Sequence, residues 1–300
     1  MDENINLPNL LIVGAAKCGT TSLHNYLKQH SDIFMTEHKE PHFLINSEIG
    51  EDRVHNAVTS LEEYKKMFKT EGKYKYKGES SVMYLAFPEF SIKNIKKYLD
   101  PDVKIIIMLR NPIERAFAGY LHNLRYNPSE DLSFEDAFDK SEERYHQVGD
   151  MTPDTRYLHV GNYHSQVESF MTMFNDNVLV ILYDDYINDI DLCLSNVFDF
   201  LDIDKIFVDT LRKHMVGGWI FKRKFLRNLF IPKNNFKSLI KSFLPNNKIR
   251  KALKHKMMNI SIVETPCISE EMHKKLIEYY RKDINSLSKL LNKELNHWIN

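Results

Sequence analysis

Three apolar runs along the chain have the composition of strands that are buried on both faces of a parallel sheet. They are LLIV at residues 10–13, VKIIIML at 103–109 and NVLVILYDDY at 177–186. Continuous runs of aliphatic and β-branched residues, without alternating polar positions, are typical of parallel strands covered by helices. Residues 74–79 are a further, less regular candidate strand.

Helical patterns alternate with these runs. Leu23, Tyr26 and Leu27 have the i, i+3, i+4 spacing of one helix face. Asn111 and Pro112 provide an N-cap and a first helical residue after the second run. Strands that alternate with helices indicate βαβ units, so we predict a three-layer α/β fold with a central parallel sheet, formed as one domain over residues 1–300. Helices are expected at residues 112–125, 163–174, 192–201 and 269–291, the last as part of a helical carboxyl-terminal embellishment.

Composition is that of an ordinary soluble globular chain. The 300 residues are 43% hydrophobic. No apolar run approaches the ~18 residues of a membrane span, and Gly14 and Lys17 interrupt the first run at once, so we expect neither a span nor a signal peptide. The three cysteines lie far apart without a C-x-x-C pattern, which argues against a disulfide framework or a zinc cluster. A cytoplasmic location is therefore expected.

The charges are balanced overall but unevenly distributed. The formal net charge is zero, yet residues 210–263 contain many Lys and Arg and no Asp or Glu. Such a tract forms either a solvated basic face or a contact with an anionic partner, such as nucleic acid or an anionic membrane surface. The sequence leaves both interpretations open.

The turn after the first predicted strand reads GAAKCGTTS, residues 14–22. A strand-to-helix turn presents consecutive backbone N–H groups and the positive end of a helix dipole, which together bind a phosphate or a similar oxyanion. A nucleotide-hydrolysing P-loop has a lysine directly after its second glycine. Here that position is Thr20, and the lysine is Lys17, inside the turn. The fold is thus predicted to be P-loop-like, with a displaced cation.

A second anion-binding position is predicted at Arg110, which follows the strand at 103–109. A strand-end arginine in an α/β sheet lies in the ligand crevice, where its guanidinium suits phosphate; the alternative is a salt bridge at the sheet edge. Two such positions suggest a nucleotide with phosphates at both ends.

Asp184 and Asp185 end the third run and would suit a magnesium-dependent kinase, which stays an alternative. A catalytically inactive protein that binds anions or nucleic acid is another.

Several segments resemble the PAPS-dependent sulfotransferases, whose sulfate donor is 3′-phosphoadenosine-5′-phosphosulfate (PAPS). They are VGAAKCGTTSL, KEPHFL, GESSVMYL, MLRNPIERAFAGYLHNLRY and GNYHSQVESFMTMFNDNVLVILYDDY, and the resemblance continues through VFDFLDI to Trp298. It covers most of the chain and points to the branch with the heparan sulfate sulfotransferases and their bacterial relatives. The resemblance implies metal-free sulfate transfer to a hydroxyl of a glycan or glycolipid, with 3′,5′-adenosine bisphosphate (PAP) as product.

The resemblance also implies which residues hold the donor. Lys17 would contact the oxygen that bridges sulfate and phosphate, and Arg110 would hold the 3′-phosphate. A basic segment in the 210–263 tract would close over the nucleotide. The implied PAPS-binding residues are Gly14, Lys17, Cys18, Gly19, Thr20, Thr21, Ser22, Arg110, Ala118, Lys213, Arg223 and Lys224.

The segment KEPHFL supplies two titratable side chains, Glu40 and His42, on either side of Pro41, which excludes helix. By resemblance, Glu40 is the general base and His42 assists it. The same resemblance places Ser81 and Tyr84 in the acceptor cleft.

Two positions depart from the family pattern. Ala118 stands where the family has a serine that binds the 3′-phosphate, so one charge-assisted hydrogen bond of ~1–2 kcal/mol is lost. Ser80 stands where the family usually has a lysine. We expect four other polar residues of the matched segments to be uninvolved in chemistry: His38 and Lys39 as exposed loop residues, and His24 and His122 as surface or packing residues.

Overall fold

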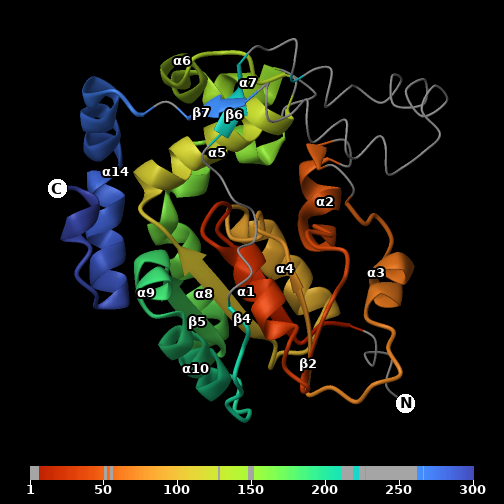
Figure 1. The fold of residues 1–300 in the computed structure, drawn as a ribbon. Helices are drawn as coiled ribbons and strands as arrows, with labels where there is room; N and C mark the ends of the chain where they lie inside the picture. Colours follow the sequence, from red (N-terminus) through yellow and green to blue (C-terminus); the bar gives the residue numbers. More distant parts are fainter. Residues whose placement is uncertain are drawn as a thin grey trace.

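The computed structural model describes residues 7–50, 53–54, 57–127, 129–147, 152–210, 219–222, 227, 262–265 and 267–300 (Figure 1). Its centre is a five-stranded parallel sheet in the order β2-β3-β1-β4-β5. The strands are β1 (Leu10–Gly14), β2 (Ile33–Met35), β3 (Tyr76–Ser80), β4 (Lys104–Leu109) and β5 (Val178–Leu182). Every residue of β1 is buried, as the continuous apolar run predicts.

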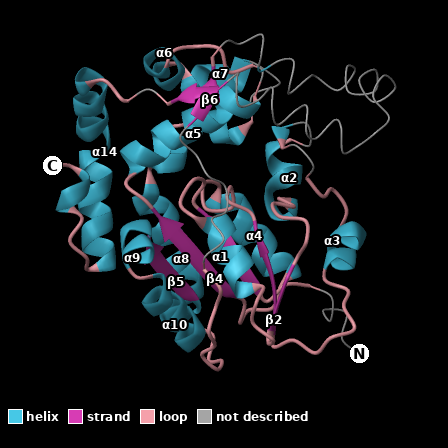
Figure 2. Ribbon diagram, in the orientation of Figure 1, coloured by secondary structure: helices cyan, strands magenta, loops and turns pink. Residues whose placement is uncertain are grey.

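Helices lie on both faces of the sheet (Figure 2). Crossovers between parallel strands are right-handed, so the helix that leads from β1 to β2 and those that lead from β3 to β4 and from β4 to β5 cover opposite faces. The principal helices are α1 (Thr20–Leu27), α2 (Phe43–Ile49), α3 (Leu61–Met67), α4 (Pro88–Tyr98), α5 (Pro112–Tyr126), α6 (Phe134–Asp139), α7 (Ser141–Gln147), α8 (Tyr163–Phe174), α9 (Tyr183–Asn188), α10 (Ile190–Phe200) and α14 (Glu270–Leu291). The three-layer α/β architecture is thus confirmed.

The carboxyl-terminal helix α14 completes the core. Its buried face, which includes Leu276, Tyr280 and Ile284, packs against α8 and α5 and belongs to the same apolar cluster as the sheet. The predicted helical embellishment is present in this helix. No described helix has the length and apolarity to cross a membrane.

One expectation about secondary structure was wrong. The strand expected at 177–186 ends at Leu182, and Asp184 and Asp185 lie in the first turn of α9, where their charges favour the helix start. The segment after residue 201 also contains a two-stranded antiparallel pair that the sequence did not indicate, formed by β6 (Trp219–Phe221) and β7 (Ile262–Glu264). Residues between these two strands lie mostly outside the described part of the chain.

Candidate active site

The turn between β1 and α1 is the centre of the candidate site. Gly19 is the N-cap of α1 and has a φ of 90°, a left-handed conformation that glycine adopts without strain. A β-carbon there would lie 3.1 Å from the ring of Tyr183, so the turn also packs too closely for a side chain. The first amides of α1, at Thr20 and Thr21, have no acceptor within the helix and carry the positive end of its dipole. This is the geometry of an oxyanion-binding turn.

Arg110 lies beside this turn, as predicted. Its strand, β4, pairs with β1, and the Ala15 amide donates to the Met108 carbonyl at 2.7 Å. The Arg110 guanidinium lies over the Tyr183 ring, 4.9 Å from its centroid, and bonds Glu114 through Nε at 2.9 Å and Nη2 at 2.7 Å. The salt bridge that was the alternative for Arg110 is therefore also present. An anion bound to Arg110 would share its guanidinium with Glu114 or displace Glu114 from it.

Lys17 reaches from the turn to α5, where its Nζ lies 3.2 Å from Nδ1 of His122. Burial, followed by the charge of Arg125, lowers the pKa of Lys17 to about 8. Burial and the charge of Lys17 lower the pKa of His122 to about 4, so His122 is neutral at pH 7 and its Nδ1 accepts from the ammonium group. Among the described residues no carboxylate pairs with Lys17. Its charge is thus available to a bound anion.

Glu40 and His42 lie beyond the carboxyl end of β2. The Glu40 amide donates to the Ser80 carbonyl at 2.9 Å, which fixes this segment beside the end of β3. Glu40 Oε2 is 3.7 Å from Nε2 of His42, and Oε1 is 2.5 Å from Nζ of Lys39. Burial alone raises the pKa of Glu40, but the contacts with His42 and Lys39 more than offset it and hold that pKa well below its ordinary value. Glu40 is therefore ionised, with 41% of its side chain exposed.

The buried carboxylate of Glu79 fixes the backbone of His42 through the Ser81 hydroxyl. Glu79 is fully buried and accepts hydrogen bonds from the hydroxyls of Ser81 (2.8 Å), Tyr84 (2.7 Å) and Tyr64 (3.0 Å). The Ser81 hydroxyl accepts from the His42 amide at 3.0 Å. Ser81 and Tyr84 are themselves fully buried, so the structure places them as supports of His42 rather than as side chains open to an acceptor. The Nδ1 atom of His42 is buried without a hydrogen-bond partner among the described residues.

Ser80 contacts a histidine. Its hydroxyl lies 2.8 Å from Nδ1 of His24, whose Nε2 is 3.1 Å from the Thr36 carbonyl. Burial lowers the pKa of His24 to about 4, so the ring is neutral and donates through Nε2. His24 is thus a buried packing residue, as expected. At the end of β3, Ser80 and His24 therefore form an uncharged hydrogen-bonded pair.

Several chemistry-bearing residues share an unusual backbone conformation. Lys17, Glu40 and His42 have φ values of 68°, 65° and 50°, in the left-handed region that side-chain-bearing residues rarely adopt. Such strain is held by the surrounding structure and concentrates at functional sites. Its occurrence at all three predicted catalytic residues is consistent with a site organised for chemistry.

The remaining predicted donor-binding residues have different placements. Cys18 is fully buried, its thiol lies 3.7 Å from the Tyr163 hydroxyl, and its amide donates to Ala15 within the turn. Both Cys18 groups therefore have partners within the chain, and a contact between Cys18 and the donor stays a prediction. Ala118 is half-buried on α5. Lys213, Arg223 and Lys224 lie outside the described residues.

The side chains of Asp184 and Asp185 contact residues near the carboxyl terminus. Asp184 Oδ2 accepts from Nε1 of Trp298 at 2.7 Å and lies 3.1 Å from Nε2 of His297. Asp185 pairs with Lys293 at 2.9 Å. Within the described part of the chain, no group of three metal-ligating side chains is arranged to hold a metal ion. These contacts give Asp184 a structural role and offer no support for the kinase alternative.

The fold and the site combine a turn of oxyanion-binding geometry, at the carboxyl ends of β1 and β4, with an ionised carboxylate beyond the end of β2. Residues 7–261 match the model of the sulfotransferase domain. The chain belongs to the sulfotransferase family.

Relatives are similar at low identity. Carbohydrate sulfotransferase 15 of Mus musculus is 23% identical over 251 residues, covering 66% of this chain and 44% of the relative. The bifunctional heparan sulfate N-deacetylase/N-sulfotransferase 1 of the same species is 26% identical over 188 residues, covering 58% of this chain and 20% of the relative. The chain therefore matches less than half the length of these curated relatives.

A solved structure is similar over nearly its whole length. The sulfotransferase from Alicyclobacillus acidocaldarius has a TM-score of 0.74 and 28% identity, covering 98% of this chain and 99% of that protein. The predicted sulfotransferase fold is thereby confirmed.

Three residues of the site were missed or misjudged at the sequence level. His122 contacts Lys17 rather than solvent or core, and Lys39, expected to be exposed, keeps 19% of its side chain exposed and pairs with Glu40. Arg125, one helical turn after His122, was given no role. The i, i+3 spacing of His122 and Arg125, on the helix that follows Arg110, was the available signal.

Proposed function

We propose that this protein transfers the sulfuryl group of PAPS to a hydroxyl of a carbohydrate or glycolipid. The observation that carries the proposal is the adjacency of two cationic positions, Lys17 in the β1–α1 turn and Arg110 at the end of β4. Adjacent strand ends hold the opposite sides of one nucleotide in open α/β sheets. The donor fits this set of groups, because the turn, the α1 amino terminus, Lys17 and Arg110 all favour anions.

Each residue has a defined part in the proposed reaction. Thr20, Thr21 and Ser22 lie at the start of α1 and hold the 5′-phosphate, while Arg110 holds the 3′-phosphate. The donor supplies an activated sulfate whose S–O bond to phosphate breaks as the acceptor oxygen attacks sulfur in line. Lys17, held by neutral His122, stabilises the charge that develops on the departing phosphate oxygen. Transfers of this type depend mainly on positioning and charge stabilisation.

Glu40 takes the proton of the acceptor hydroxyl in this proposal. It is ionised in the free protein and partly exposed, so it is ready to accept a proton without a preceding deprotonation step. His42 lies against its second oxygen, and the Glu79 network fixes the His42 backbone. Lys39 keeps the carboxylate charged until the acceptor binds.

The names of the relatives support a glycan acceptor, since they are a carbohydrate sulfotransferase and a heparan sulfate N-sulfotransferase. The direct test is incubation with radiolabelled PAPS and a panel of glycans, glycolipids and small alcohols. Label in a glycan or glycolipid supports the proposal. Label only in small alcohols contradicts the acceptor class, and no transfer with no PAP binding contradicts the function itself.

A catalytically inactive anion-binding protein is the second candidate, and the basic composition of residues 210–263 favours it. Steeply salt-dependent retention on DNA or acidic lipid, together with no affinity for PAP, would support this candidate. The cytoplasmic location and a contact of this tract with an anionic surface stay predictions.

A further inference from the structure

Arg125 is a buried cation that has no acidic partner among the residues that the structure describes. The residue is 7% exposed, and its Nε is buried without a hydrogen-bond acceptor among the described residues. No Asp or Glu of the described chain forms an ion pair with it. Arginine remains charged at neutral pH, and a buried charge is costly unless it is paired. This arrangement is best explained by an anion that binds from outside the chain.

The position of Arg125 is next to the proposed reaction centre. Arg125 follows His122 by three residues on α5, which places the two side chains on one face of the helix. His122 contacts Lys17 at 3.2 Å. The charge of Arg125 also contributes to the lowered pKa of Lys17, after burial. A group held by Arg125 would therefore lie beside the site of sulfuryl transfer.

Two aromatic rings flank the guanidinium. Its centre lies 5.3 Å from the ring centroid of Trp219 on β6 and 5.8 Å from that of Tyr126 on α5. Aromatic rings orient a guanidinium through cation–π contacts and leave its N–H groups free for a carboxylate or sulfate. Aromatic rings beside polar groups also suit an amphipathic ligand such as a sugar.

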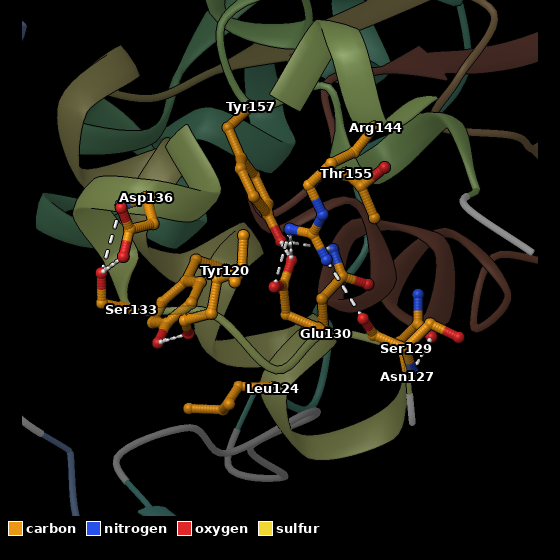
Figure 3. A network of polar contacts seen from close by, with 12 residues as sticks. Tyr120, Leu124, Asn127, Ser129, Glu130, Ser133, Asp136, Arg144, Thr155 and Tyr157 are labelled. Atoms are coloured by element: carbon orange, nitrogen blue, oxygen red, sulfur yellow. Dashed lines mark hydrogen bonds and ion pairs between the residues drawn. The ribbon is translucent and has the colours of Figure 1, made fainter. Parts of the chain in front are cut away.

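Two acids in segments that adjoin α5, Glu130 and Asp154, have other partners. Glu130, buried in the loop after α5, bonds Arg144 at 2.9 and 3.2 Å and the Tyr157 hydroxyl at 2.7 Å (Figure 3). Asp154 accepts from the hydroxyl of Thr152 through Oδ1. The tract that carries Trp219, residues 210–263, contains no Asp or Glu in the sequence. It cannot supply an intramolecular counterion.

We propose that Arg125, with Tyr126 and Trp219, forms an acceptor subsite that binds an oxyanion substituent, a carboxylate or a sulfate ester, on the sugar to be sulfated. This inference rests on the proposed sulfotransferase function. The donor's two phosphates are already matched by the β1–α1 turn and by Arg110. Arg125 thus selects acceptors by charge, and it acts in binding rather than in the chemical step.

Calorimetry on the protein saturated with PAP tests this subsite. Three ligands separate the sources of the oxyanion: an unsulfated chondroitin oligosaccharide, its carboxyl-reduced neutral form, and carboxyl-reduced chondroitin 4-sulfate. We expect the wild type to bind at least one anionic ligand at least tenfold more tightly than the neutral one. Arg125→Gln should remove that preference and leave the affinity for the neutral ligand and for PAP unchanged.

Two variants serve as comparisons. Arg125→Lys keeps the charge without the planar fork and should retain an intermediate preference. Arg281→Gln removes an exposed arginine of α14 and should bind every ligand like the wild type. An equal loss of affinity for charged and neutral ligands in Arg125→Gln would overturn the subsite, as would a wild type that binds PAP without preferring either anionic oligosaccharide. Failure to bind PAP would instead overturn the proposed function.

Discussion

The ammonium group of Lys17 lies 3.2 Å from Nδ1 of His122, joining the β1–α1 turn to the middle of α5. The histidine is neutral at pH 7, so the positive charge of the pair resides on the half-buried lysine. A lysine held in this way can lie against a bridging oxygen without being neutralised by an acid. The displaced lysine of the turn is therefore held by a hydrogen-bond acceptor, Nδ1 of His122, which lies 105 positions away in the sequence.

Lys17→Ala should reduce sulfuryl transfer by at least about 10²–10³-fold in kcat, because it removes the cation aimed at the developing charge. The thermal unfolding midpoint should change little, since Lys17 forms no ion pair with an acid of the described chain and burial disfavours its charge. Steady-state kinetics and circular dichroism measure the two effects. Lys96→Ala, at an exposed position on α4, is the matched control. Full activity of Lys17→Ala would refute the assignment.

The affinity for PAP should depend on pH through Lys17. Its pKa is about 8 in the free protein, and a bound anion favours the charged form and raises it. Binding is therefore strongest below pH 8, weakens as the pH rises above 8, and takes up a proton in that range. Calorimetry at pH 8.5 in buffers of different ionisation enthalpy measures this uptake. Lys17→Arg should abolish it, and equal uptake in that variant would assign the proton to another group.

Glu40→Gln should lower kcat by about 10²–10⁴-fold and leave the affinity for PAP nearly unchanged, because the amide cannot accept the acceptor proton. The pKa of Glu40 lies below its ordinary value, so the carboxylate stays ionised and its titration should cause no loss of activity between pH 6 and pH 8. Glu37→Gln, in the same loop and 86% exposed, is the control. Equal losses of kcat and PAP affinity would indicate a structural role for Glu40.

Ala118→Ser should tighten the binding of PAP by roughly fivefold to 30-fold, which corresponds to ~1–2 kcal/mol for one added hydrogen bond to a phosphate. The affinity for 5′-AMP, which lacks the 3′-phosphate, should not change. Calorimetry with the two nucleotides makes the comparison. A gain for both nucleotides, or for neither, would mean that residue 118 does not face the 3′-phosphate.

The sheet was largely predictable because its strands carry long apolar runs. β1 and β4 lie within one or two residues of the predicted bounds, since burial on both faces leaves an unambiguous pattern. β2 was missed, because three residues give no periodicity. The predicted third strand extended too far, into α9. Asp184 and Asp185 were counted as the end of the strand, although acidic residues also favour the first turn of a helix.

The parts of the site that are encoded in short sequence motifs were predictable, whereas the parts that depend on tertiary contacts were not. The turn with Lys17 and the strand end with Arg110 each carry a signal within ten residues. His122 and Glu79 acquire their roles from partners in other elements, Lys17 and Tyr64, and isolated polar residues on helices or strands carry no such information. Arg125 is recognisable only from its burial together with the lack of an acidic partner in the described part of the chain.

The account's central claim is that the β1–α1 turn and Arg110 hold opposite ends of one adenosine bisphosphate. The most direct measurement compares the affinities of wild type and Arg110→Gln for PAP and for 5′-AMP by calorimetry. Removing one charge-assisted contact should weaken PAP binding by about 10-fold to 100-fold and leave 5′-AMP binding unchanged. Equal weakening of both nucleotides, or of neither, would contradict the claim.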